Sequence, residues 1–277
     1  MTCAWKELLG ILPVWIAEEV ENTGRTCLQE LRLRCGKPPE LVMASESKWL
    51  SRSCCRDDLN HCVNMASRYS PWAAQTASEG YITAPGGHRI GLCGDAVMKE
   101  GTIRGIKEVR MICIRVARDY PGIARKADNL TGSILLLGPP GSGKTTLLRD
   151  LVRHISETQT VAVVDERGEL FPAAGGFDSG RKLDVLCGCP KSIGIDMVLR
   201  TMGPSCIAVD EITAENDCKA LIRAGWCGVR LLATAHAANL HDLNARPVYR
   251  SLVTTRLFDH ILILRRDKSW YVERMDL

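Results

Sequence analysis

The sequence predicts a two-domain α/β protein, with a smaller α+β domain over residues 1–128 and a domain built on a mainly parallel β-sheet over residues 129–277. Two observations support this division. After residue 129, short apolar runs alternate with helical stretches, which is typical of a parallel sheet covered by helices on both faces. Before it, strand-like and helix-like periodicities follow one another without that rhythm. The length of 277 residues suits two domains of ordinary size.

The elements of the N-terminal domain follow from apolar periodicity. Apolar residues within Met1–Val20 recur at helical spacing, so we expect an amphipathic helix there. The tripeptide Pro-Gly-Gly at 85–87 separates two short apolar runs and predicts a hairpin. The expected strands are Leu31–Cys35, Leu41–Met43, Tyr81–Thr83, Arg89–Leu92 and Met111–Val116, and a helix is expected at Asp57–Arg68.

The elements of the second domain alternate in type. The expected strands are Ile134–Leu137, Val161–Val164, Cys206–Val209, Leu231–Ala233 and Ile261–Leu264. The expected helices are Lys144–Ile155, Ile195–Met202 and Ala214–Ala224. Phe171–Gly194 is rich in glycine and contains two prolines, which predicts a long loop, and long loops in compact domains are often functional or mobile.

Composition indicates a soluble cytoplasmic protein. The net charge of +4 is too small to indicate a nucleic-acid-binding face, so no direct nucleic-acid partner is expected. No secretory signal is recognisable, and no apolar run approaches the about 18–20 residues that cross a bilayer. The 13 cysteines are therefore interpreted as reduced thiols. Neither Cys54, Cys55, His61 and Cys62 nor Cys187 and Cys189 has the paired spacing of a zinc site, which favours structural thiols over a metal.

One motif carries a specific chemistry. Residues 138–145, GPPGSGKT, match the G-x-x-x-x-G-K-[ST] pattern at every fixed position, between an expected strand and an expected helix. Glycines let consecutive backbone N–H groups point at one phosphate, and the helix adds its positive N-terminal end. Lys144 reaches the β- and γ-phosphates, and the Thr145 hydroxyl is a Mg²⁺ ligand. The predicted ATP-contacting residues are Gly138, Pro139, Pro140, Gly141, Ser142, Gly143, Lys144, Thr145 and Thr146.

Acidic residues at strand ends complete the predicted site. Cys206–Val209 is an apolar strand followed by Asp210 and Glu211. The carboxyl ends of parallel strands form the crevice in which ligands bind. Asp210 is therefore expected to hold Mg²⁺ together with Thr145, and Glu211 to orient or deprotonate the attacking water. The alternative is a strand that ends in a solvated acidic turn.

Two further strand ends extend the site. Val163–Val164 is followed by Asp165, Glu166, Arg167, Gly168 and Glu169. Glu166 is the preferred second catalytic carboxylate and Glu169 the next, and a surface salt-bridge cluster with Arg167 is the alternative. Leu231–Ala233 leads to His236, which we expect to sense the γ-phosphate, although a lone histidine after a strand is more often structural. This order of strands is typical of the RecA-like P-loop class, in which a glutamate activates water.

At this point the chain resembles the secretion-ATPase superfamily, which includes the type II and type IV secretion motors. Residues 164–169 are similar to its "Asp box", and Thr234–Ala237 to its "His box". Where that family often has glycine before the glutamate, this chain has Asp210. A closer resemblance, to the stage III sporulation AA family of endospore-forming bacteria, extends over residues 86–94, 112–118 and 184–191.

The resemblance implies a function and partners. It implies a cytoplasmic ATPase of the mother cell that forms a homo-hexamer and associates peripherally with membrane proteins of a mother cell–forespore channel. It also implies that arginines of the N-terminal domain or of a neighbouring subunit contact the nucleotide and stabilise the transition state. The candidates by position are Arg89, Arg104, Arg110 and Arg115, and a surface or salt-bridge role is the alternative for each of them. Two alternatives to a motor remain open, a nucleic-acid-associated ATPase and a nucleotide-controlled switch.

Overall fold

The chain folds into two compact units. The computed structural model describes residues 3–24, 27–43, 45–67, 77, 80–172 and 177–274. One unit comprises Met1–Asp119 with Pro172–Phe177, and the other comprises Tyr120–Phe171 with Asp178–Leu277. Residues 120–128, which the sequence analysis placed in the N-terminal domain, therefore belong to the second unit. They are held there because the backbone N–H groups of Gly122 and Ala124 donate to the carboxylate of Asp150, at 3.0 and 2.8 Å.

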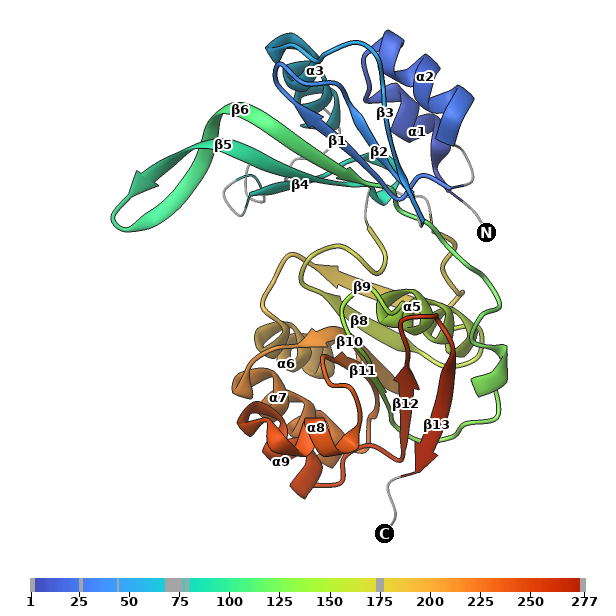
Figure 1. Ribbon diagram of the computed structural model, residues 1–277. Helices are drawn as coiled ribbons and strands as arrows, with labels where there is room; N and C mark the ends of the chain where they lie inside the picture. The colour runs from blue at the N-terminus through green and yellow to red at the C-terminus, as the bar shows by residue number, and fades with distance from the viewer. Residues whose placement is uncertain are drawn as a thin grey trace. The chain divides into compact units, whose positions relative to one another are not determined.

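The first unit is built on an antiparallel sheet of six strands in the order β3-β2-β1-β6-β5-β4 (Figure 1). A core of aliphatic residues from both helices and strands, including Leu8, Ile16, Leu31 and Ile114, is fully buried. Its helices are α1 (Trp5–Gly10), α2 (Val14–Gly24), α3 (Arg56–Ser67) and the short 3-10 turn η1 (Pro85–Gly87). Its strands are β1 (Glu30–Arg34), β2 (Glu40–Val42), β3 (Ser47–Trp49), β4 (Tyr81–Thr83), β5 (Arg89–Lys99) and β6 (Thr102–Arg115).

Two expectations for this unit need correction. The single helix expected over Met1–Val20 is two helices, α1 and α2, because Pro13 lies between them and has no N–H with which to continue a helix. The strands expected at Arg89–Leu92 and Met111–Val116 are much longer than their apolar cores. They continue as a β5–β6 ribbon that reaches Lys99 and Thr102, with mostly exposed residues toward its tip. The apolar residues of the extension, such as Val97, Met98 and Ile103, are exposed and do not alternate regularly with polar ones, so the sequence did not indicate the extension. The expected strand Tyr81–Thr83 and its antiparallel pairing with β5 are confirmed. The helix expected at Asp57–Arg68 is α3, with Arg68 outside the described residues.

The second unit is built on a sheet of seven strands in the order β13-β12-β7-β11-β10-β8-β9. Neighbouring strands from β12 to β9 pair in parallel, whereas β13 pairs antiparallel with β12, so the sheet is mixed rather than purely parallel. Its strands are β7 (Ile134–Leu137), β8 (Val161–Asp165), β9 (Leu183–Cys187), β10 (Cys206–Ile212), β11 (Arg230–Ala235), β12 (His260–Leu264) and β13 (Trp270–Arg274). Its helices are η2 (Arg125–Ala127), α5 (Lys144–Ile155), α6 (Lys191–Thr201), α7 (Glu215–Trp226), α8 (Leu240–Ala245), η3 (Pro247–Tyr249) and α9 (Arg250–Thr254).

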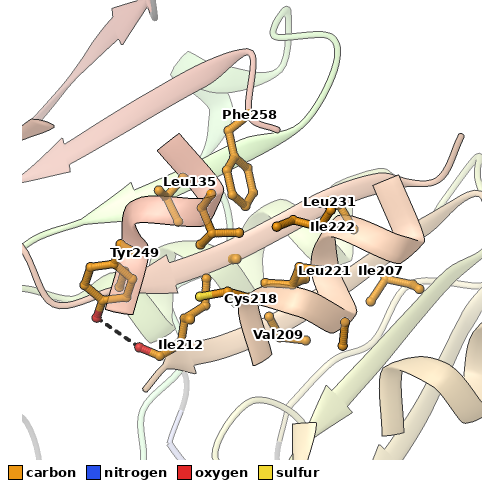
Figure 2. Close-up of a cluster of buried hydrophobic side chains, with 14 of the residues drawn as sticks. Leu135, Ile207, Val209, Ile212, Cys218, Leu221, Ile222, Leu231, Tyr249 and Phe258 are labelled. Atoms are coloured by element: carbon orange, nitrogen blue, oxygen red, sulfur yellow. Dashed lines mark hydrogen bonds between the residues drawn. The ribbon is translucent and has the colours of Figure 1, made fainter. Parts of the chain in front are cut away.

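Alternate residues of each central strand enter different cores. Leu135 and Leu137 of β7 pack with α6, α7 and α9 on one face, whereas Ile134 and Leu136 pack with α5 on the other. Figure 2 shows the first of these cores, where the Tyr249 hydroxyl donates to the carbonyl of Ile212 at 3.0 Å. Because the strands are buried on both faces, they appear in the sequence as continuous apolar runs.

The segment Phe171–Gly194 is not a long loop as expected. Within it lies the edge strand β9, parallel to β8, and α6 begins at Lys191. Asp184 interrupts the apolar residues of β9, and all five residues of this edge strand are at least partly exposed, so it lacks the continuous buried run that identified its neighbours. Residues 173–176 lie outside the described part of the chain. Close packing continues at Gly194, where an added Cβ would lie 2.5 Å from a Val164 methyl group.

Candidate functional site

The polar site lies where parallel strands of the second unit end. The P-loop, residues 138–145, follows β7 and leads directly into α5, whose first residue is Lys144. Gly143 has a φ of +97°, which an L side chain rarely adopts, and it precedes the helix as its cap residue. Gly138 lies so close to the strand β12 that an added Cβ would be 2.8 Å from the Leu264 carbonyl oxygen. Glycine is therefore required here for both the curvature and the packing of the loop.

The ammonium group of Lys144 has three hydrogen-bond partners, two in the loop and one at the end of β11. Its Nζ donates to the carbonyl oxygens of Gly138 at 2.8 Å and Pro139 at 3.1 Å, and lies 3.1 Å from Nδ1 of His236. Burial lowers the pKa of the Lys144 ammonium group, while Asp210 and Glu211 act in the opposite direction. A phosphate that binds in this loop would replace these acceptors, since three N–H donors of an ammonium group serve three partners here.

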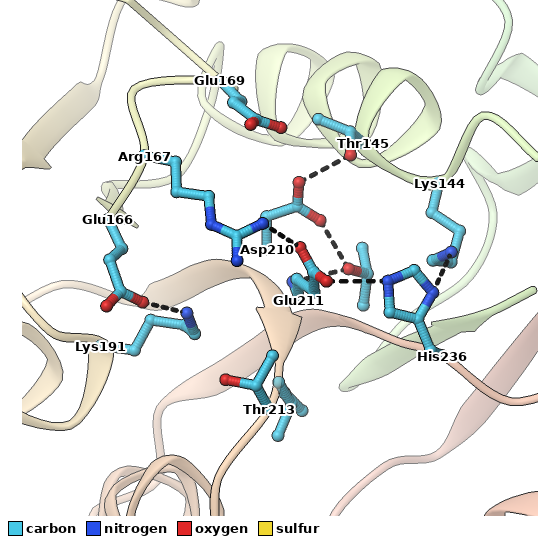
Figure 3. A network of polar contacts seen from close by, with 12 residues as sticks. Lys144, Thr145, Glu166, Arg167, Glu169, Lys191, Asp210, Glu211, Thr213 and His236 are labelled. Atoms are coloured by element: carbon cyan, nitrogen blue, oxygen red, sulfur yellow. Dashed lines mark hydrogen bonds and ion pairs between the residues drawn. The ribbon is translucent and has the colours of Figure 1, made fainter. Parts of the chain in front are cut away.

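Asp210 and Glu211 face different partners, although they are adjacent. Oδ2 of Asp210 accepts from the Thr145 hydroxyl at 2.6 Å, and Oδ1 accepts from the Thr234 hydroxyl at 2.5 Å. The Glu211 backbone has a φ of +55°, and the pairing of β10 with β11 shifts register between Val209 and Ile212. Successive side chains of a regular strand point to opposite faces, and this bulge allows both carboxylates to enter the same polar site (Figure 3). The backbone N–H of Glu211 donates to the Thr234 hydroxyl at 2.7 Å, which ties the bulge to β11.

Both carboxylate oxygens of Glu211 have partners (Figure 3). Oε1 lies 2.8 Å from Nε2 of His236, and Oε2 accepts from Nη1 of Arg167 at 2.7 Å. Because the Lys144 ammonium group can only donate, Nδ1 of His236 accepts and Nε2 carries the proton that it donates to Glu211. A continuous chain of contacts thus joins the P-loop lysine to the acid at the tip of β10.

The strand β8 contributes a second group of charges. Burial raises the pKa of Asp165, and hydrogen bonds from the backbone N–H groups of Phe171, Glu169 and Leu170 oppose that shift. Glu166, the expected second carboxylate, forms an ion pair with the buried Lys191. The residues that line the small cavity between these groups are Asp165, Glu166, Arg167, Glu169, Lys191, Asp210 and Glu211.

The structure thus brings most of the predicted site residues together. Lys144, Thr145, Asp210, Glu211 and His236 form one network, and Glu166 and Glu169 line the adjoining cavity.

Sequence reasoning missed Asp165 as the acid that holds the turn, and also Lys191 and Thr234, and it considered Arg167 only as a partner in a surface salt-bridge cluster. The spacing of Asp165 from Glu169 across Gly168 is a turn signal from which the role of Asp165 could be inferred. Nothing comparable marks Lys191, whose partner is 25 residues away in the chain.

The candidate arginines belong to the first unit. Arg115 lies 3.4 Å from the Glu30 carboxylate, Arg110 pairs with Asp95, and the Arg89 guanidinium lies 4.1 Å from the centre of the Tyr81 ring. Arg104 is exposed on the β6 part of the ribbon. Their expected contact with nucleotide stays a prediction.

The residues present fit a Mg²⁺–nucleotide complex. The Thr145 hydroxyl and the Asp210 carboxylate are hard oxygen ligands of the kind that Mg²⁺ takes, and they already lie in contact. The Ser142 hydroxyl is buried in the P-loop without a hydrogen-bond partner among the described residues. Within that same part of the chain, no cluster of three or more His, Cys, Asp or Glu residues is arranged for a metal ion. Among the described helices, none combines the length and the hydropathy of a membrane-spanning segment.

The fold and the site define a P-loop protein whose fold is similar to that of solved ATPases, among them a pilus retraction motor. The ATPase DotB of Legionella pneumophila superposes with a TM-score of 0.59 at 18% identity, covering 95% of this chain and 80% of that one. The pilus retraction motor PilT superposes with a TM-score of 0.64 at 15% identity, covering 95% and 82%. At these identities the likeness concerns the fold alone.

Sequence comparison then shows the family. Residues 6–271 match the family model described as sporulation stage III, protein AA, and the chain belongs to that family. It is 35% identical over 257 residues to stage III sporulation protein AA of Bacillus subtilis, covering 87% of this chain and 84% of that protein. It is also 30% identical to an uncharacterised protein, ycf45, of Porphyra purpurea, covering 90% of this chain but 43% of that longer protein. The predicted sporulation resemblance is confirmed.

Proposed function

We propose that this chain is a Mg²⁺-dependent ATPase of the secretion-motor type. The observation that carries the proposal is the network from the P-loop to Glu211. At the tip of β10, Asp210 contacts the P-loop threonine, where Mg²⁺ would bind, and Glu211 is the acid that would act on the attacking water. A strand that ended in a solvated acidic turn would not place Asp210 against the P-loop threonine. The family membership and the motor-ATPase fold support the same activity.

In the proposed phosphoryl transfer, different residues bind the phosphates, hold the metal ion and activate the water. The P-loop backbone N–H groups, the N-terminal end of α5 and Lys144 bind the β- and γ-phosphates. Thr145 and Asp210 would hold Mg²⁺, which when bound neutralises charge on the phosphate oxygens. Glu211 accepts a proton from the attacking water, the water oxygen bonds to the γ-phosphorus, and ADP leaves with the electrons of the broken P–O bond. His236 holds the Glu211 carboxylate toward the P-loop.

The biological setting is also part of the proposal. A cytoplasmic homo-hexamer that works with membrane proteins of a mother cell–forespore channel is what the family membership supports. In such a ring, Arg89, Arg104 or Arg115 would supply positive charge to the nucleotide of the same or a neighbouring subunit. Light scattering with and without a non-hydrolysable ATP analogue tests the ring, and an unchanged monomer mass in both conditions would contradict it.

The ATPase proposal is tested on the P-loop lysine. Lys144→Ala removes the point charge that reaches the phosphates, so nucleotide affinity should fall by at least about 10-fold, which corresponds to about 1.4 kcal/mol. Lys219→Ala, on the exposed side of α7, removes the same charge away from the site and serves as the control. If calorimetry gave equal Mg-ATP affinities for both variants and the wild type, the P-loop would not be the nucleotide site.

A further inference from the structure

Arg167 lies on a turn whose backbone is fixed. The turn follows β8, and its far end is tied down because the Asp165 carboxylate accepts from the N–H groups of Glu169, Leu170 and Phe171 at 2.8–3.0 Å. The side chain of Arg167 leaves this turn and points toward the tip of β10, as Figure 3 shows. The side chain is 47% exposed, so it has room to change rotamer while its base stays in place.

The contact of Arg167 occupies the acid that the proposed reaction needs. Nη1 of Arg167 lies 2.7 Å from Oε2 of Glu211, while the other oxygen is held by His236. A guanidinium group at Oε2 stands where a water molecule would approach that oxygen. With Arg167 in this position, each carboxylate oxygen of Glu211 is held by a donor from the protein.

Two cations line the cavity, and their environments differ. Lys191 is 5% exposed and paired with Glu166, so its movement would leave a buried charge without a partner. The side chains of the Arg167–Glu211 pair are 47% and 29% exposed, and an ion pair that reaches solvent adds little stability. Arg167 is therefore the cation that can exchange partners at low cost.

A γ-phosphate offers Arg167 a stronger partner. Guanidinium groups bind phosphate oxygens in a bidentate manner, and such charge-assisted pairs are about twice as strong as neutral hydrogen bonds. A γ-phosphate bound for attack by a water on Glu211 would lie beside that carboxylate, and so beside its arginine partner. ADP has no γ-phosphate and would leave Arg167 on Glu211.

We propose that Arg167 is a γ-phosphate-dependent clamp on Glu211. Without a γ-phosphate it holds Oε2 of Glu211, and with ATP bound it transfers to the γ-phosphate oxygens. The transfer frees Oε2 to accept the proton of the attacking water and places a positive charge on the phosphoryl group as its charge develops. This inference rests on the ATPase activity proposed above, and it adds a residue that distinguishes ATP from ADP.

The test compares three arginine variants in the full-length protein. Arg167→Gln removes the clamp, Arg167→Lys keeps its charge, and Arg223→Gln removes a matched exposed pair with Asp196, which has the same 2.7 Å separation and a 48% exposed arginine. Affinities for Mg-ADP and for a non-hydrolysable Mg-ATP analogue are measured by calorimetry, and kcat and KM for ATP by phosphate release. Thermal unfolding of each variant reports whether it is folded.

Arg167→Gln should bind the ATP analogue about 10-fold more weakly and Mg-ADP within about 2-fold of the wild type. Its kcat should fall by about 10²-fold or more, the effect of removing one donor from a developing charge. Arg167→Lys should recover part of both losses, and Arg223→Gln should match the wild type.

Other outcomes would overturn the inference. If Arg167→Gln weakened both nucleotides equally, or behaved like Arg223→Gln, Arg167 would be a static partner of Glu211 and the clamp would be wrong, while wild-type turnover would leave the ATPase proposal standing. If the wild type neither bound nor hydrolysed Mg-ATP, both proposals would fail.

Discussion

Nε2 of His236 lies 2.8 Å from Oε1 of Glu211, and Nδ1 of the same ring lies 3.1 Å from Nζ of Lys144. One imidazole thus joins the end of β11 to both the P-loop and the tip of β10. The positive φ of Glu211 places its side chain in reach of this ring. A positive φ is energetically unfavourable for a glutamate, and such strained residues are typical of functional sites.

His236→Ala should lower kcat without comparable loss of nucleotide binding. The His236 ring positions Glu211 and is not part of the P-loop, so the affinity for Mg-ADP should stay within about 3-fold of the wild type. The kcat should fall by up to about 10²-fold, because Glu211 would no longer be held in position. Steady-state phosphate release and calorimetry give the two quantities. His241→Ala, on the exposed side of α8, is the control. A large loss of binding with unchanged kcat would mean that the ring stabilises the bound nucleotide and the transition state equally and does not position Glu211 for the reaction.

Asp210→Asn should weaken the binding of Mg²⁺ and leave the binding of the metal-free nucleotide unchanged. Asp210 accepts from the Thr145 hydroxyl at 2.6 Å, and its charge is what an oxygen-ligated cation would share. The concentration of Mg²⁺ at half-maximal ATPase rate should therefore rise several-fold, about 1 kcal/mol or more. Titration of Mg²⁺ at fixed ATP measures it, and addition of EDTA to the wild type should stop turnover. An unchanged Mg²⁺ requirement in the variant would exclude Asp210 from the metal site.

The sequence predicted the strands whose side chains are buried on both faces better than the strands that are exposed. The strands β7, β8, β10, β11 and β12 are buried on both faces and appeared as apolar runs, and the P-loop appeared as a motif with local spacing. The edge strand β9 is partly exposed and the distal β5–β6 ribbon is mostly exposed, and neither contains a continuous run of buried apolar residues. Lys191 and Arg167 belong to the site through partners 25 and 44 residues away, a relation that local patterns do not contain.

Because the ring of His88 is buried, we expect the first unit to lose stability in mildly acidic solution. The ring is fully buried, its Nε2 lies 2.8 Å from the Ala4 carbonyl oxygen and its Nδ1 accepts from the N–H of Ala117 at 3.1 Å. Burial lowers the pKa of His88 below its ordinary value of 6.5. The unfolded chain therefore binds a proton first as pH falls below 6.5, and the stability that His88 contributes at neutral pH is lost between 6.5 and its lower folded pKa.

Urea unfolding at about pH 7.5 and about pH 5.5 checks this dependence. The wild type should lose more stability over that interval than His88→Gln, whose side chain does not titrate. His154→Gln, at an exposed position, is the control and should follow the wild type. Equal losses in all three proteins would show that His88 does not control the acid sensitivity.

The most direct test of the central claim is phosphate release from Mg-ATP by the wild type and by Glu211→Gln, with binding of a non-hydrolysable analogue measured in parallel. The amide cannot take the proton of the attacking water but keeps the size of the side chain. The account predicts wild-type turnover, and in the variant a loss of kcat of at least about 10²-fold with nucleotide affinity retained. Turnover by Glu211→Gln at the wild-type rate would contradict it, because the acid at the tip of β10 would then have no part in hydrolysis.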